Sequence, residues 1–252
     1  MRKLKVLQIN PLGVTMGIRD FKPCKDWLRR INFIDRIELW NYIHDEAHQI
    51  ARSFFLANPQ YSHFLFLAED VIATPDVVRL ILEDVEKFGY PVVCGVSNVD
   101  FRNEVANIGF RNMRNLVVRG REVYQHPKIS DVVQGKYGYP IIKVWFMGNT
   151  LTCIRRDVVE KLSFKPYLYT SSLPTRRWFG VSRPIGVMQD LQMCIELDAL
   201  GIPIYCDVRA FAVHFTMPIS EINAVGKIRE VIFYGKNGEI KKIREDAPYI
   251  NG

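Results

Sequence analysis

Residues Phe64–Asp76 read FLFLAEDVIATPD, and this stretch decides the fold that we expect. Its first four residues are continuously apolar, which is typical of a parallel strand that is buried on both faces. Two carboxylates, Glu69 and Asp70, follow where that strand ends. Thr74 is a good helix N-cap, and the proline after it suits the first helical position. The stretch therefore predicts a buried strand, an acidic turn and a helix.

The flanking segments repeat this alternation. Lys5–Ile9 reads as a strand, and Ile37–Phe55 has apolar residues at steps of three and four, which predicts an amphipathic helix. The helix after the acidic turn has Gly89 as its stop, and Pro91–Val96 is another apolar strand. This order is the signature of a wound parallel sheet, in which ligands bind beyond the carboxyl ends of the strands.

The second half of the chain is less regular. Residues 100–139 are polar, basic and glycine-containing, which indicates hairpins or a loop-rich insertion. Strands are expected over Ile141–Met147 and Leu151–Ile154, and a short helix over Arg155–Leu162. Tyr167–Ile185 shows no periodicity, so we expect a long loop there.

The last part of the chain returns to regular elements. Met188–Leu200 has helical periodicity, and Ile202–Cys206 and Ala210–Val213 read as two short strands. Residues 231–240 contain an Asn-Gly pair between apolar residues, which predicts a hairpin.

Composition excludes several classes of protein. With 48% hydrophobic and 24% charged residues in a chain of 252, we expect a folded core and not a disordered chain. No apolar run approaches the roughly 20 residues of a membrane helix, and no signal-peptide pattern is present, so we expect a cytoplasmic protein. The five cysteines are scattered and form no C-x-x-C pair, which favours free thiols over structural zinc.

The net charge of +7 suits anionic partners. Zinc-finger, RNP-type and KH signatures are missing from the sequence, so we expect no nucleic-acid partner. The basic residues of the 100–139 insertion leave peripheral contact with an anionic membrane, or with an anionic acceptor, as a possibility. A solvated basic face is the alternative.

Three polar features are candidates for chemistry. Glu69 and Asp70 would repel each other unless they are solvated, protonated or bound to a cation, and Mg²⁺ or Mn²⁺ prefers such oxygen ligands. His214 ends an apolar strand and is either a structural histidine or a metal ligand. Asp190 begins a helix and is either a capping group or a general base. A solvated acidic loop is the alternative for the carboxylate pair.

In this order, the features resemble those of GT-A-fold glycosyltransferases, especially inverting family-2-like enzymes. The resemblance extends from about Lys5 to His214. It is carried by the strand, acidic motif and helix of Phe64–Asp76, by Phe146–Asn149 with Ile154–Arg156, by Gln189–Leu191, by Glu196–Ile202 and by Val213–His214.

The resemblance implies roles for individual residues. Asp70 would bind the metal ion, with Glu69 beside it contacting the metal or the donor sugar. Asp190 would be the catalytic base, and His214 would ligate the metal or touch the diphosphate. The donor site would also include Asn10, Pro11 and Arg183.

Two positions depart from the family pattern. Ala68 stands where the first Asp of Asp-x-Asp is expected, and Gln189 stands where Glu is frequent before the base. The first departure puts metal affinity and the ribose contact in question.

The resemblance implies an α/β fold with a GT-A-like, Rossmann-type central mixed, mostly parallel sheet and helices on both faces. Residues 1–220 would form the catalytic domain, with a nucleotide-binding half over 1–99 and an acceptor and catalytic half over 100–220. Residues 221–252 would add a C-terminal hairpin.

The expected activity is metal-assisted transfer of a sugar from a UDP- or GDP-linked donor to a hydroxyl acceptor, with Mn²⁺ or Mg²⁺ and inversion by Asp190. Two alternatives stay open. One is a nucleotidyltransferase acting on a sugar phosphate, and the other is a degenerate, non-catalytic nucleotide-sugar-binding protein.

Overall fold

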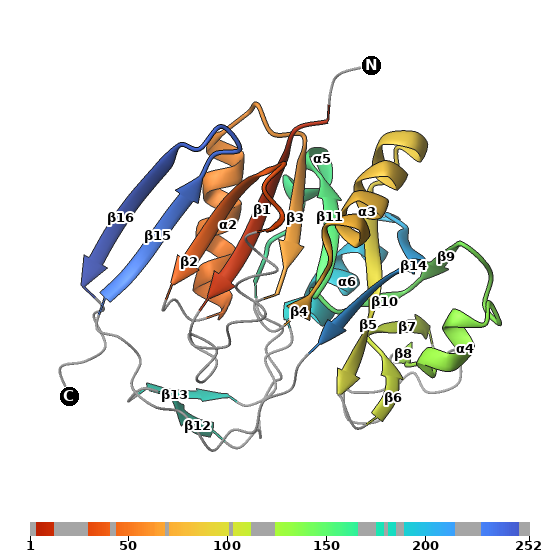
Figure 1. Ribbon diagram of the computed structural model, residues 1–252. Helices are drawn as coiled ribbons and strands as arrows, with labels where there is room; N and C mark the ends of the chain where they lie inside the picture. The colour runs from red at the N-terminus through yellow and green to blue at the C-terminus, as the bar shows by residue number, and fades with distance from the viewer. Residues whose placement is uncertain are drawn as a thin grey trace.

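A computed structural model describes residues 4–12, 30–40, 44–68, 71–100, 103–111, 124–165, 175–178, 181–184, 189–214 and 228–246. It shows a mixed α/β fold around one large sheet (Figure 1). The main path of this 11-stranded sheet has the order β16-β15-β2-β1-β3-β11-β5-β14-β4, with β6 on β5 and β9 on β14.

The strands of the large sheet are β1 (Val6–Leu12), β2 (Asp35–Trp40), β3 (His63–Leu67), β4 (Val71–Ile72), β5 (Val92–Asp100), β6 (Asn103–Ala106), β9 (Ile141–Val144), β11 (Leu151–Arg155), β14 (Ile204–His214), β15 (Ile228–Tyr234) and β16 (Ile240–Asp246). A small sheet holds β7 (Ile108–Arg111), β8 (Tyr124–Gln125) and β10 (Phe146–Met147), and another pairs β12 (Thr175–Trp178) with β13 (Val181–Pro184). The helices are α2 (His44–Ala57), α3 (Pro75–Phe88), α4 (Ile129–Val133), α5 (Arg156–Val159) and α6 (Gln189–Ala199).

The large sheet is mixed, as expected, but most of its described strand pairs are antiparallel, where a mostly parallel sheet was expected. Among the described strands, parallel pairing joins β1 to β2, β1 to β3 and β5 to β14. The strand β11 lies between β3 and β5 and is antiparallel to both. An antiparallel strand therefore separates the two parallel groups.

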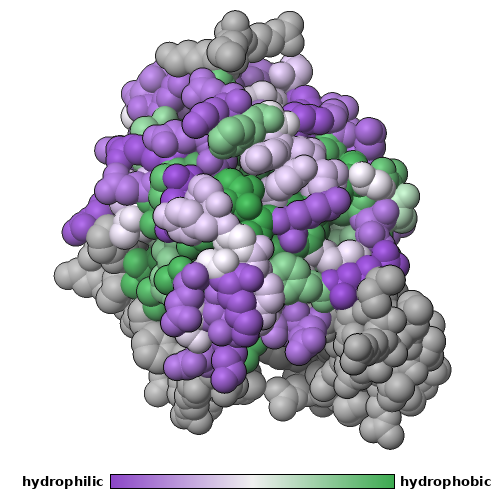
Figure 2. All heavy atoms as spheres, turned by 90° about the vertical axis from the view of Figure 1, so that its right-hand side faces the viewer, coloured by the Kyte–Doolittle hydropathy of each residue, from purple (hydrophilic) through white to green (hydrophobic). Residues whose placement is uncertain are grey.

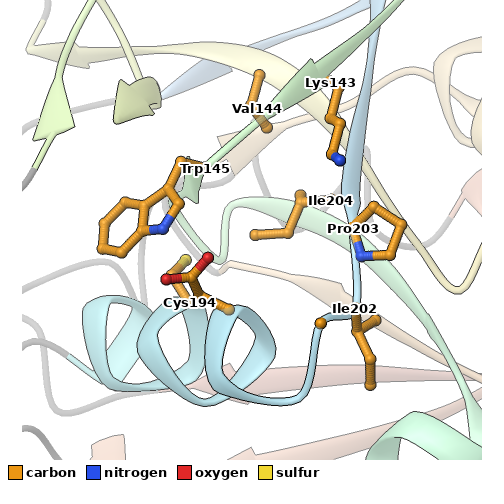
Figure 3. Close-up of a pocket in the computed structure, with 9 residues that line it drawn as sticks. Lys143, Val144, Trp145, Cys194, Ile202, Pro203 and Ile204 are labelled. Carbon is orange, nitrogen blue, oxygen red and sulfur yellow. The ribbon is translucent and has the colours of Figure 1, made fainter. Parts of the chain in front are cut away.

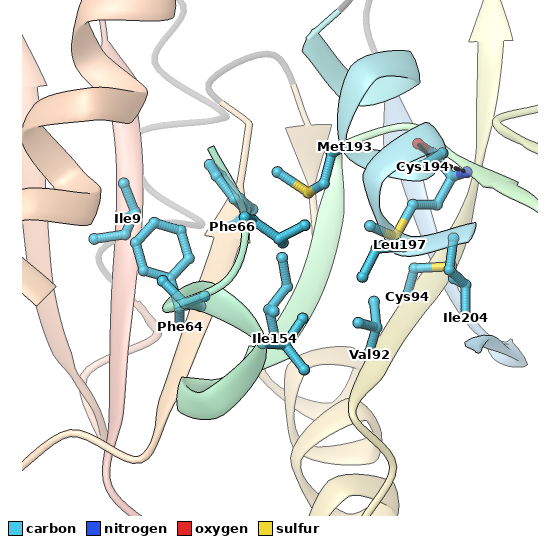
Figure 4. Packing of buried hydrophobic residues seen from close by; sticks show 14 of the residues in the cluster. Ile9, Phe64, Phe66, Val92, Cys94, Ile154, Met193, Cys194, Leu197 and Ile204 are labelled. Atoms are coloured by element: carbon cyan, nitrogen blue, oxygen red, sulfur yellow. Dashed lines mark hydrogen bonds between the residues drawn. The ribbon is translucent and has the colours of Figure 1, made fainter. Parts of the chain in front are cut away.

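Helices cover both faces of the sheet. Side chains of β3 alternate, so that Phe64 and Phe66 join a core with α2, α5 and α6, while Leu65 and Leu67 join a second core with α3. Figure 1 shows α2 and α6 on one side of the sheet and α3 on the other. Figure 4 shows the first core, where Phe66 and Ile154 of the sheet lie beside Met193 of α6.

The helix α3 begins and ends as its sequence predicts. The Val77 backbone N–H donates to Thr74 Oγ1 at 3.3 Å, and Pro75 is the first residue of the helix. Gly89 has a φ of 64° and its N–H donates to Val85 O, a left-handed helix end that glycine adopts without steric cost.

The prediction of one helix over Ile37–Phe55 is wrong. Its first residues form β2, between β1 and β15, and α2 starts only at His44. In β2 the apolar Ile37 and Leu39 alternate with Arg36 and Glu38, which are also buried and form an ion pair at 3.1 Å. The apolar residues keep steps of three and four from the strand into the helix, so the pattern over both elements predicts one continuous helix.

Two further expectations change. The two short strands expected over Ile202–Cys206 and Ala210–Val213 are one strand, β14, which begins at Ile204 and whose register against β5 shifts between Asp207 and Phe211. Inside the expected long loop, Tyr167–Ile185, the structure has the antiparallel pair β12–β13. The predicted C-terminal hairpin is present as β15–β16, and β15 extends the sheet by pairing with β2.

The described surface mixes polar and apolar side chains. Figure 2 shows the side of the molecule at the right of Figure 1, where apolar side chains reach the surface between hydrophilic ones. Within the described ranges, no helix is both long and apolar enough to span a membrane.

Candidate active site

The ends of β1 and β3 are joined by a buried carboxamide. Asn10 Nδ2 donates to Leu67 O at 2.8 Å, and Asn10 Oδ1 accepts from Gln8 Nε2 at 2.8 Å. Asn10 thereby holds the strand end that precedes Ala68. Its neighbour Pro11 lies in β1, where the structure describes the backbone alone. The predicted donor residue Asn10 therefore has a structural task at the carboxyl edge of the sheet.

The acidic turn follows this strand end. Glu69 and Asp70 lie outside the described residues. The residues around them are placed: the Ala68 N–H donates to Thr150 O at 3.0 Å, and Val71 begins β4. In the antiparallel pair β4–β14, Val71 is the partner of His214. The fold thus brings His214 opposite the residue that directly follows Asp70.

The imidazole of His214 is held in a defined position. Its backbone N–H donates to Asn98 Oδ1 at 2.9 Å, and its carbonyl accepts from Asn98 Nδ2 at 2.7 Å. Nδ1 lies 3.2 Å from Val99 O, and because a carbonyl only accepts, Nδ1 carries the proton in this contact. In a neutral ring the lone pair would then be on Nε2, the arrangement by which histidines ligate metal ions.

Asp190 lies in the first turn of α6. Its Oδ1 accepts the backbone N–H of the next residue, Leu191, at 2.9 Å, a contact within the first turn and not the usual N-cap contact two or three residues on. Burial raises the pKa of Asp190 to about 6, against the lowering effect of the backbone N–H groups of Leu191 and of Asp190 itself. A carboxylate with this pKa is ionised at neutral pH and accepts a proton more readily than an ordinary one.

Gln189, next to Asp190, anchors this turn in the core. Its Nε2 donates to Phe164 O at 2.9 Å, and its Oε1 contacts Nδ1 of the buried His48 on α2. Phe66 packs edge-on against His48 with ring centroids 4.7 Å apart. Phe164 has a φ of 55°, an uncommon conformation for a residue other than glycine. The anchor was not foreseen, because nothing in the sequence around His48 links it to Gln189.

A further polar group was missed where β5 and β11 meet. Asn107 Oδ1 accepts the Ser97 N–H and Asn107 Nδ2 donates to Thr150 Oγ1, both at 2.7 Å. Beside Thr150, the carboxamide N and O of Asn149 are buried without a partner among the described residues. An unsatisfied buried polar group costs about 1–3 kcal/mol, so such groups draw attention to sites that water or ligand completes. The Gly148-Asn149 pair after a strand was the available signal.

The remaining predicted donor residue, Arg183, lies in β13 opposite Arg176 of β12. The structure describes only its backbone. In the part of the chain that is described, no contact joins the side chains of Asn10, Asp190 and His214. Among all the residues that the structure describes, there is also no group of three or more His, Cys, Asp or Glu side chains that could hold a metal ion.

The basic pair at the start of α5 has a structural role. Arg156 donates from Nη2 to the carbonyls of Phe55 and Asn58, at the end of α2, at 2.8 and 2.7 Å. Arg155 donates from Nη1 to Gly89 O, at the end of α3, at 2.8 Å. The two arginines therefore satisfy carbonyls that end the helices on opposite faces of the sheet.

Comparisons with known proteins support the fold alone. No protein-family model matches the sequence, and a comparison with curated proteins finds no significant match. Among solved structures, the chain is similar to the crystal structure of A197 from STIV, with a TM-score of 0.52 and 16% identity over 99% of both chains. The fold is therefore a mixed α/β architecture shared with at least one known structure along its whole length.

Proposed function

We propose that this protein is a GT-A-like glycosyltransferase, which moves a sugar from a UDP- or GDP-linked donor to a hydroxyl acceptor. The observation that carries the proposal is the pairing of His214 with Val71, directly after Asp70. A lone histidine or a lone acidic turn is weak support, whereas their meeting at the carboxyl edge of a wound sheet matches where such folds bind ligands.

The proposed reaction assigns Asp190 as the general base. Its carboxylate takes the proton of the acceptor hydroxyl while that oxygen attacks the anomeric carbon from the side opposite the diphosphate, which leaves with inversion. The pKa of about 6 leaves Asp190 ionised at neutral pH yet basic enough to act. The GT-A-like description is supported by the parallel pairs β1–β3 and β5–β14, whose strands contain Asn10 and His214.

The donor site is proposed to include Asn10, Pro11, Glu69 and Arg183. Asp70 and His214 Nε2 offer oxygen and nitrogen ligands that fit Mn²⁺ or Mg²⁺ together with substrate phosphates. A divalent cation held there would neutralise charge that develops on the diphosphate as it leaves. An anionic membrane surface is one further partner that the basic insertion would suit.

The test is calorimetric titration of the protein with UDP, GDP, UDP-glucose and GDP-mannose, with and without Mn²⁺. We expect at least one nucleotide to bind more tightly with Mn²⁺. Binding of none of them would remove the proposal. The anomeric configuration of the product, read by NMR, would then test inversion.

Ala68 favours a second candidate, a protein that binds nucleotide sugars without turning them over. Its methyl group replaces the first carboxylate of the family motif at the end of β3. Donor binding in the titration combined with no transfer and no donor hydrolysis would support this candidate over the enzyme.

A further inference from the structure

A small open pocket lies at the opposite end of α6 from Asp190. It has a volume of about 140 Å³ and is lined by Lys143, Val144, Trp145, Cys194, Asp198, Gly201, Ile202, Pro203 and Ile204. These residues come from β9 and the residue after it, from α6, from the connection between α6 and β14, and from the first residue of β14. The start of β14 is the end of the sheet away from His214, so the pocket is separate from the candidate active site.

The walls of the pocket differ in chemistry. Figure 3 shows the indole of Trp145 on one side, Lys143 and Pro203 on the other, and Ile204 between them. The backbone of Trp145 is held by its N–H, which donates to Gly109 O at 2.9 Å. The pocket thus combines a flat aromatic surface with an aliphatic floor.

Two charges of opposite sign complete the lining. Lys143 is exposed and contributes an ammonium group, which only donates hydrogen bonds. Asp198 contributes a carboxylate, which only accepts, and its Oδ2 lies 3.4 Å from Arg111 Nη1. A ligand that suits both must carry donors and acceptors together and no strong net charge.

We propose that this pocket binds one pyranose ring of a neutral glycan. A pyranose has an apolar face of C–H groups that can lie on the indole, and hydroxyls that donate to Asp198 and accept from Lys143. The volume is below the roughly 300 Å³ at which pockets for drug-sized ligands begin, so it suits a single ring and not a nucleotide.

The pocket binds without reacting. Cys194, the one thiol among the described lining residues, is fully buried, and burial raises the pKa of its thiol well above the usual value. A thiol of this kind stays protonated and is a poor nucleophile.

Its distance from the candidate base suits a glycan longer than one sugar. Asp190 and Asp198 are eight residues apart on one helix, which corresponds to a rise of about 12 Å. Binding of a pyranose here does not depend on the proposed function, but its use as an acceptor-anchoring site does. The two ideas can therefore fail separately.

The test uses the indole N–H signals of the full chain in a ¹H–¹⁵N NMR spectrum. The sequence has four tryptophans, and Trp145→Phe assigns the signal of Trp145 by its loss. Methyl glycosides of glucose, galactose and mannose are titrated to about 50 mM, since contacts of this size give millimolar affinity. We expect at least one glycoside to shift the Trp145 signal saturably, while inorganic phosphate leaves it unmoved.

The matched variants separate binding from folding. Lys143→Met combined with Asp198→Asn should weaken the glycoside at least about five-fold while the other indole signals stay in place, because each loses a hydrogen-bonding charge. Lys241→Met, on the distant β16, should leave the affinity unchanged. No saturable shift with any glycoside, equal binding by the double variant, or a shift with phosphate would each overturn the proposal.

Discussion

Two carboxylates with raised pKa values lie in different regions of this molecule, and only one is a candidate for catalysis. Asp84 is buried on α3, where burial and a hydrogen bond to Asp207 raise its pKa to about 7. Asp190 lies in the first turn of α6, where burial raises its pKa to about 6. The size of the shift would favour Asp84 as the functional residue.

The surroundings reverse that ranking. Asp84 and the fully buried Asp207 face one cation, Arg209, which donates from Nη2 to Asp207 Oδ2 at 2.8 Å and reaches Asp84 Oδ1 at 3.4 Å. This group ties α3 to β14, and its two carboxylates share Arg209 inside the protein, while Asp84 Oδ2 is buried without a hydrogen-bond partner among the described residues. For Asp190, the pKa is affected by burial and by backbone N–H groups, with no side-chain partner among the causes. A raised pKa therefore indicates function only where the carboxylate keeps capacity for a ligand.

The largest expected effect is on turnover. Asp190→Asn should lower the transfer rate by about 10²–10⁴-fold, because an amide cannot take the acceptor proton. Donor affinity, measured by calorimetry, should stay within about two-fold of wild type, since the base does not hold the donor. Asp84→Asn is the matched control and should keep the wild-type rate. An equal loss of transfer rate in Asp190→Asn and Asp84→Asn would contradict the assignment of Asp190 alone to catalysis.

The pH dependence of the rate is the next test. Since Asp190 has to be ionised, the rate of transfer should fall about tenfold per pH unit below its pKa of about 6. The measurement is kcat between pH 4.5 and 8 in wild type and in Asp84→Asn, at about half-unit steps. A midpoint that moves in Asp84→Asn would show that the two carboxylates are coupled.

Removing Arg209, the cation that Asp84 and Asp207 share, should lower the stability of the protein. Arg209→Met leaves Asp84 and Asp207 without their shared positive partner, and we expect about 2 kcal/mol lower unfolding free energy at pH 8. Urea unfolding followed by circular dichroism measures this. The loss should shrink at pH 5, where one proton between the two carboxylates removes most of their repulsion. A pH-independent loss would instead indicate lost packing of the arginine stem.

Removing the charge of Asp84 should do the opposite. The pKa of Asp84 is higher in the folded state than the ordinary 3.8, so the folded protein binds more protons and stability falls as pH rises from about 4 to about 7. Asp84→Asn should therefore be more stable than wild type by about 1–2 kcal/mol at pH 8. The difference should shrink as the pH falls and vanish below about pH 3, where the wild-type carboxyl is protonated in both states.

The sequence was most informative where local chemistry decides the structure. The cap of α3 at Thr74, its end at Gly89 and the buried strand β3 follow from residues within a few positions of one another. The assignment of β2 failed because a strand next to a helix can continue its apolar spacing. Only pairing with β1 and β15 shows that Ile37 is in a strand.

The same contrast between local and distant residues holds for the candidate site. The position of His214 at a strand end and of Asp190 in the first turn of a helix could be predicted from neighbouring residues. Their environment could not, because the partners are distant in sequence: Val71 for His214, and His48 for the glutamine beside Asp190. Contacts across more than a hundred residues leave no local pattern to detect.

The antiparallel strand β11 also has a consequence for how the chain is made. Residues 151–155 separate β3 from β5, which are complete about fifty residues earlier. Until β11 emerges from the ribosome, both earlier strands have an unpaired edge that invites contact with other chains. A nascent chain that ends near residue 100 should thus depend on chaperones more than one that reaches residue 165, and a truncated gene product of the shorter length should aggregate.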